Sequence, residues 1–110
     1  MTIKQLTKKD LTISIVALEE IISIHDDEFL TSKQKKDISK RLDYNIWAWC
    51  CVKVECTYYS LTATSYLGCC SYQDEQDFIK NSGYYEDMIN DCLIDLQGQL
   101  STLIAESVSF

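Results

Sequence analysis

The chain has 110 residues, of which 46% are hydrophobic and 25% charged, and its formal net charge is −7. This length and composition fit one globular domain spanning residues 1–110 and exclude a disordered chain. The absence of an apolar leader and of a run of about 20 apolar residues predicts a soluble, cytoplasmic protein with no membrane partner. Residues 1–43 are neutral as a set, whereas residues 44–110 carry nine acidic residues against Lys53 and Lys80. Direct binding of nucleic acid is therefore disfavoured, because phosphates need cations.

The first 43 residues are predicted to form a pair of helices. Thr7 and Asp10 match a capping box, and apolar residues then recur at helical spacing from Leu11 to Ile22. Thr31 and Gln34 give a second cap signal, which predicts a shorter helix to about residue 42. Its cations, Lys33, Lys35, Lys36, Lys40 and Arg41, admit two interpretations, a solvated face or a phosphate-binding patch. A nucleotide sponge would use four of them, Lys33, Lys36, Lys40 and Arg41, for phosphates and an aromatic residue for the base.

From residue 46 the hydrophobic period changes to two, which predicts an antiparallel β-hairpin with strands at 46–58 and 62–72. A turn centred on Ser60 would place Cys50 opposite Cys70 and Cys51 opposite Cys69. Adjacent cysteines on a strand point to opposite faces, so free thiols are favoured over a cross-strand disulfide or a metal site. No cofactor is indicated.

The last third of the chain is predicted to be helical. A short acidic helix runs from Asp74 to Asn81 and ends before Gly83, which suits a left-handed position after the helix. A long helix follows from Tyr84. The predicted fold class is therefore α+β, with an N-terminal helical pair, a central hairpin, a short acidic helix and a long C-terminal helix.

Acidic and aromatic residues are the candidates for partner binding. Asp87, Asp91 and Asp95 recur at i, i+4 and i+8, so their carboxylates are expected along one side of a helix. Such a row is either a solvated face or a surface that binds a basic groove. Trp and Tyr are frequent at interface hot spots, although they also fill small cores. The candidate residues are Asp74, Glu75, Asp77, Glu86, Asp87, Asp91, Asp95, Trp47 and Trp49.

Catalysis has little support in the sequence. His25 is the only histidine, and neither a glycine-rich phosphate loop nor a nucleophile motif is present. We therefore expect that the protein is not an enzyme.

Three segments together resemble a pattern in small bacteriophage and prophage proteins, most of which have no assigned function. They are Ile46-Trp47-Ala48-Trp49-Cys50, Tyr66-Leu67-Gly68-Cys69-Cys70-Ser71-Tyr72 and Gly83-Tyr84-Tyr85-Glu86-Asp87-Met88. The resemblance implies a mobile genetic element in a bacterial host cell, where small acidic proteins often inhibit host defence, anti-CRISPR proteins among them. No functional residue carries over from it.

The leading hypothesis is an inhibitor that binds a host defence protein or ribonucleoprotein complex. Alternatives are a sponge that sequesters a nucleotide signal, and a structural or regulatory phage protein. An exposed sheet edge and the apolar stripe of the first predicted helix also favour a homodimer.

Overall fold

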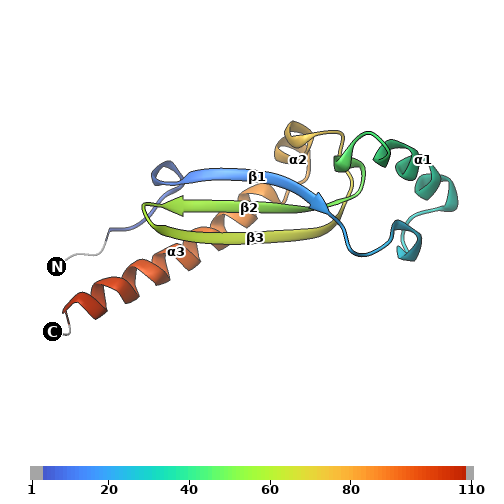
Figure 1. Cartoon of the computed structure of the whole chain (residues 1–110). Coiled ribbons are helices and arrows are strands. Elements are labelled where there is room, and N and C mark those ends of the chain that lie inside the picture. Colours follow the sequence, from blue (N-terminus) through green and yellow to red (C-terminus); the bar gives the residue numbers. More distant parts are fainter. Residues whose placement is uncertain (1–3, 109–110) are drawn as a thin grey trace.

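The computed structural model describes residues 4–108 and has an α+β architecture, in which a long helix lies along one face of an antiparallel sheet (Figure 1). The sheet has three strands in the order β1-β2-β3. In chain order the elements are β1 (Thr12–Glu19), α1 (Ser32–Leu42), β2 (Cys50–Tyr58), β3 (Leu61–Cys70), α2 (Glu75–Asn81) and α3 (Tyr85–Val108). Short 3-10 turns occur at η1 (Lys8–Asp10), η2 (Ile24–Asp26) and η3 (Ile46–Ala48).

The predicted N-terminal helical pair is wrong, because its first member is strand β1. The segment pairs with β2 along its whole length, from Thr12 opposite Thr57 to Glu19 opposite Cys50. Its apolar residues fit a period of two as well as a helical period, and its β-branched residues favour an extended backbone. The edge of β2 supplies the hydrogen-bonding partner. The cap signal at Thr7 opens only the single turn η1.

The second predicted helix is confirmed as α1. The Thr31 hydroxyl accepts a hydrogen bond from the Gln34 amide at 3.1 Å, and the Gln34 side chain accepts one from the Thr31 amide at 2.8 Å. This reciprocal capping box satisfies two amides that the helix itself cannot pair.

The hairpin is confirmed, with two changes. Its first strand begins at Cys50, since the preceding residues form η3. Cys50 lies opposite Cys70 as predicted, but the register shifts between Cys50 and Val52, where β3 carries one residue more than β2. Gly68 and Cys69 thus both lie across from Cys51, so the predicted simple Cys51–Cys69 pair is replaced by a bulge.

Two separate cores hold the fold together. The main core lies between the sheet, α2 and α3, and its fully buried side chains include Val52, Val54, Phe78, Ile89 and Leu96. A smaller core joins η2, α1 and η3, which we call the α1 lobe, around Ile24, Ile38, Ala48 and Trp49.

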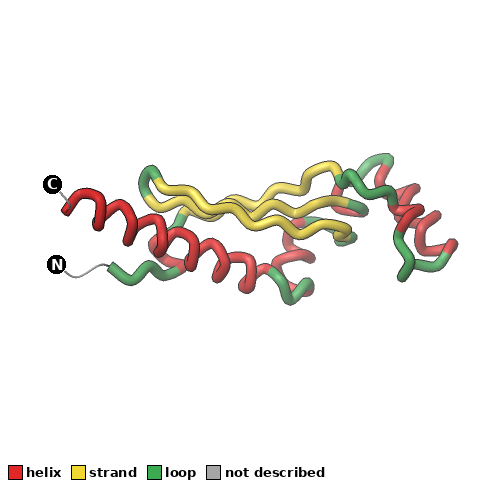
Figure 2. The backbone as a smooth tube through the Cα atoms, turned by 90° about the horizontal axis from the view of Figure 1, so that it is seen from below, coloured by secondary structure: helices red, strands yellow, loops and turns green. Residues whose placement is uncertain are grey.

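The molecule is elongated, with principal extents of 61 × 23 × 21 Å. Figure 2 shows the α1 lobe beyond one end of the sheet, and α3 extending beyond the other. The α1 lobe and the C-terminal end of α3 therefore lie at opposite ends of the molecule.

Candidate functional site

The outer side of α3 carries the predicted row of carboxylates, which we call the acidic face: Asp87, Asp91 and Asp95. All three residues are exposed, because the opposite side of the helix carries Ile89, Cys92 and Leu96 into the main core. The acidic face forms no ion pair with any of the side chains that the structure describes, residues 4–105. Asp95 accepts one hydrogen bond, from the side-chain amide of Gln99 at 3.3 Å.

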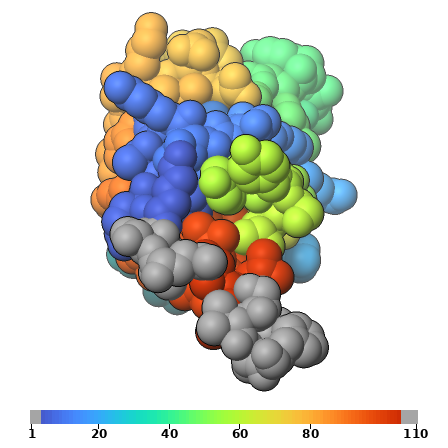
Figure 3. All heavy atoms as spheres, turned by 90° about the vertical axis from the view of Figure 1, so that its left-hand side faces the viewer, coloured from blue at the N-terminus to red at the C-terminus, as the bar shows by residue number. Residues whose placement is uncertain are grey.

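An apolar hollow of ≈ 590 Å³ adjoins the acidic face. It lies where the second half of α3 passes the β2–β3 turn, and the two segments are neighbours in Figure 3. Its lining includes Asp95, Ile94, Leu103 and Leu61. Ile94 is 73% exposed and Leu103 is 50% exposed, so apolar and acidic groups share one surface.

Two of the three predicted carboxylates around α2 serve the helix itself. Asp74 caps α2 by accepting a hydrogen bond from the Asp77 amide at 2.8 Å. Asp77 accepts hydrogen bonds from the Gln73 amide at 2.9 Å and from the Asn81 side chain at 2.8 Å. These bonds lower the pKa of Asp77. Glu75 is exposed in the first turn of α2.

Glu86 faces the N-terminal segment. Its carboxylate forms an ion pair with Lys8 at 2.8 Å, and the same ammonium lies 5.3 Å from the centre of the Tyr85 ring. Glu86 is therefore engaged within the chain, unlike Asp87 next to it.

Both tryptophans fill the interior of the fold. Trp47 is half-buried with its ring centre 6.1 Å from that of Phe78. Trp49 is 5% exposed, and its indole N–H donates to the Ile22 carbonyl at 2.9 Å. In this structure the two tryptophans therefore contribute to the core, and their role in partner binding stays a prediction.

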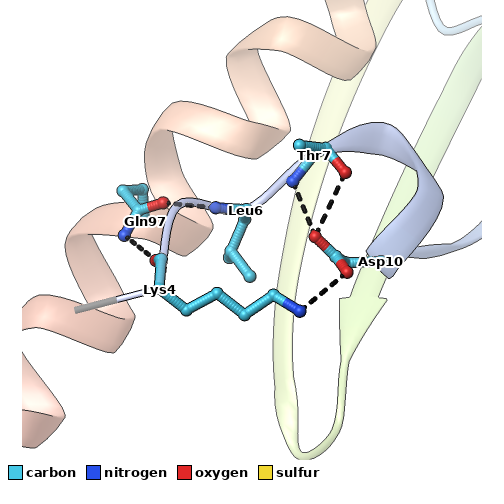
Figure 4. Close-up of polar contacts among 5 residues, drawn as sticks. All are labelled: Lys4, Leu6, Thr7, Asp10 and Gln97. Carbon is cyan, nitrogen blue, oxygen red and sulfur yellow. Dashed lines mark hydrogen bonds and ion pairs between the residues drawn. The ribbon is translucent and has the colours of Figure 1, made fainter. Parts of the chain in front are cut away.

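Two polar side chains that the sequence analysis did not identify, Gln97 and Glu20, make long-range hydrogen bonds that stabilise the fold. Gln97 binds the N-terminal segment through both ends of its amide (Figure 4): Oε1 accepts from the Leu6 amide at 2.8 Å, and Nε2 donates to the Lys4 carbonyl at 2.9 Å. Glu20 stabilises the bulge by accepting a hydrogen bond from the Cys69 amide at 2.9 Å. Neither contact has a local sequence signal, because the partners are 91 and 49 residues apart.

The cysteines are free thiols in the structure. Burial raises the pKa of Cys50 and of Cys92 to about 12, so both remain protonated near neutral pH. Among the described side chains, no three His, Cys, Asp or Glu residues are grouped so that they could hold a metal ion. Nor does any helix within residues 4–108 have the length and apolar character needed to cross a membrane.

Comparisons of the chain with models of protein families, with curated proteins and with solved structures find no match. The resemblance to phage proteins therefore rests on the three sequence segments alone, and it stays a prediction.

Proposed function

We propose that this protein is a non-enzymatic binding protein whose acidic face occupies a basic, nucleic-acid-binding site on a partner protein. The observation that carries the proposal is the row of Asp87, Asp91 and Asp95, exposed beside an apolar hollow and without an ion pair in the described chain.

Energetics favour an external partner for this row. Carboxylates at i, i+4 spacing repel one another by about 0.2–0.5 kcal/mol per pair in isolated helices. The cations that form ion pairs in the structure, Lys4, Lys8 and Lys53, pair with other acidic residues. Arginine and lysine side chains of a partner would relieve the repulsion and make charge-assisted hydrogen bonds.

The hollow adds a requirement on the shape of the partner. Leu61, Ile94 and Leu103 offer an apolar surface next to Asp95, so the best-matched partner presents an apolar side chain flanked by cations. Buried apolar contacts supply affinity at interfaces, whereas complementary charges accelerate association and select the partner.

A site of this kind on a host nucleic-acid-binding complex would be blocked by the acidic face. The resemblance to small phage proteins supports the biological context, an inhibitor of a bacterial defence complex of the kind that anti-CRISPR proteins target. Competition with nucleic acid is then the mechanism, since both ligands present anions to the same cations.

We also propose that the protein is a homodimer. The apolar stripe of the first predicted helix no longer supports this, because that segment is strand β1. The support is the free edge of β3, where Leu61–Cys70 contains no charged residue to discourage pairing with another strand. Thr64→Pro removes an amide that points away from β2 in this register, and light scattering should then report a monomer. A wild-type protein that is already monomeric at high concentration would refute the dimer.

The test of the binding proposal compares two variants of equal charge. Asp87→Lys with Asp91→Lys reverses the acidic face, whereas Glu28→Lys with Asp37→Lys reverses two exposed acids of the α1 lobe. Tagged wild type and both variants are used to capture partners from bacterial lysate, and complexes are identified by native mass spectrometry.

The proposal expects a stoichiometric complex that is lost only in the acidic-face variant and whose partner releases nucleic acid when the wild type is added. Association should also slow as salt concentration rises. A complex that survives reversal of the acidic face, or a partner that retains its nucleic acid, would contradict the proposal.

A further inference from the structure

A second polar site lies in the α1 lobe, at the opposite end of the molecule from the C-terminal end of α3. A pocket of ≈ 380 Å³ between η2 and α1 is lined by His25, Ser32, Lys35, Lys36 and Ser39. The four helical residues lie on one side of α1, because the other three are spaced three, four and seven positions from Ser32. The lining thus combines two ammonium groups, an imidazole and two hydroxyls, without a carboxylate.

The pocket is held in shape by contacts within the lobe. Lys35 Nζ donates to the His25 carbonyl at 3.0 Å, which ties η2 to α1. The neighbouring carboxylate of Asp27 accepts from the amides of Phe29 and Leu30, at 2.8 and 3.0 Å. The Asp27 carboxylate is therefore bound by the backbone of the loop that follows it. Lys36 is exposed and forms no ion pair with any side chain described in the structure, those of residues 4–105.

Ser39 gives an independent indication of a ligand. Its Oγ is buried and has no hydrogen-bond partner, the one side-chain N or O atom in the described part of the chain with this property. Buried hydroxyls are normally paired, because an unpaired one loses its hydration without compensation. Ser39 is also one of the residues that line the pocket. Its hydroxyl would need to rotate about the Cα–Cβ bond to reach an acceptor from a ligand there.

We propose that this pocket binds the phosphate group of a small phosphorylated ligand, such as a nucleoside monophosphate. A phosphate oxygen accepts hydrogen bonds from ammonium and hydroxyl groups alike, and the lining supplies both kinds. Helix α1 carries five cations and one anion, Asp37, whereas the η2 side of the pocket places Asp26 next to His25. The cations that a phosphate would meet in the pocket are therefore those of α1, Lys35 and Lys36.

The residues that line the pocket differ in part from those that the sequence predicted for phosphate binding. The sequence predicted a phosphate-binding patch of Lys33, Lys35, Lys36, Lys40 and Arg41, of which Lys35 and Lys36 line the pocket. Arg41 is used inside the fold, where its guanidinium donates to the Tyr72 carbonyl at 3.0 Å.

A small ligand suits the site better than a nucleic-acid strand. The α1 lobe offers one confined pocket, whereas a strand needs cations along an extended track. The net charge of −7 also repels a long polyanion, whereas salt limits the interactions of a single phosphate in the pocket to charges within about 10 Å.

The test is an NMR titration of the isotope-labelled full chain with inorganic phosphate, adenosine monophosphate and adenosine. We expect both phosphate-containing probes to shift the amide signals of residues 32–39, and adenosine to leave them unchanged. Tighter binding of the nucleotide than of phosphate would identify a nucleotide pocket, and equal binding a pocket for the phosphate group alone.

Three variants assign the binding to the pocket. Lys36→Gln should weaken phosphate binding about tenfold, as expected for the loss of one charge-assisted contact. Ser39→Ala should weaken it several-fold without lowering the thermal midpoint of unfolding, because the hydroxyl that is removed has no partner in the free protein. Lys33→Gln, on the same helix but outside the pocket lining, is the matched control.

The proposal is overturned if millimolar phosphate leaves residues 32–39 unperturbed. It is also overturned if Lys33→Gln weakens binding as much as Lys36→Gln, since the effect would then be unspecific attraction to α1. Neither result tests the acidic face, because α3 packs against the main core and α1 belongs to the smaller one. Partner capture tests the acidic face separately.

Discussion

The amide of Gln97 makes a two-point attachment between α3 and the N-terminal segment, and its removal should release that segment. Gln97→Ala deletes both hydrogen bonds to Leu6 and Lys4. Each such bond contributes about 0.5–1.5 kcal/mol net, so the loss is about 1–3 kcal/mol before relaxation. The bond to the Lys4 carbonyl is exposed, so water can replace it at little cost, whereas the bond from the Leu6 amide is part-buried and accounts for most of the expected loss. Leu6, which packs against the main core, should then be less restrained.

A second substitution tests the direction of each bond. In Gln97→Glu one carboxylate oxygen can still accept from the Leu6 amide, but the other faces the Lys4 carbonyl, which is also an acceptor. Protonation restores a donor there, so the pKa of the introduced carboxyl is raised in the folded state above its ordinary value of about 4.3. The deficit in stability is therefore full at neutral pH and shrinks as pH falls through the raised pKa.

Urea unfolding measures the stability, and hydrogen exchange measures the protection of the Leu6 amide. Gln99→Ala is the matched control, since Gln99 lies two residues away and its amide donates to the Thr62 carbonyl and to Asp95 without contacting the N-terminal segment. The reasoning is refuted if Leu6 stays protected in Gln97→Ala. It is also refuted if Gln97→Glu is no less stable than wild type at pH 7.

Three further predictions concern the backbone, the thiols and acid stability. Gly83 has φ +76° and open space where a methyl group would lie, so Gly83→Ala should cost about 1 kcal/mol by urea unfolding from backbone strain alone; an unchanged midpoint would contradict this. Iodoacetamide followed by mass spectrometry should label exposed Cys69 well before buried Cys50 and Cys92, whose pKa values are both raised to about 12; equal rates in the native protein would contradict the burial. The pKa of Asp77 is lowered by hydrogen bonds from Gln73 and Asn81, so its contribution to stability is complete above its ordinary pKa of 3.8 and is lost as pH falls through the lower folded value. The free energies of unfolding of wild type and Asp77→Ala, measured in urea, should therefore differ at pH 6 and become equal in acid. A difference that grows as pH falls would contradict this prediction.

Local signals in the sequence were sufficient for several elements. The Thr31–Gln34 capping box fixes the start of α1, because both partners lie within one helical turn. The positive φ of Gly83 follows from its place after a helix, where a side chain would be strained. The spacing of Asp87, Asp91 and Asp95 likewise places them on one side of α3 without any tertiary information.

Other parts of the molecule depended on partners that are distant in sequence. The apolar residues of the segment 11–22 fit both a helix and a strand, and the free edge of β2 decides in favour of β1, since an extended segment there gains a full ladder of hydrogen bonds. Gln97 and Glu20 acquire their roles only when the N-terminal segment and the bulge are brought beside them. The phosphate-site candidate depends on His25 of η2 meeting one side of α1. Hydrophobic periodicity and helix capping act over a few residues, so they could be predicted from the sequence. The choice between helix and strand for residues 11–22, and every contact between distant segments, depends on interactions that form only in the folded chain.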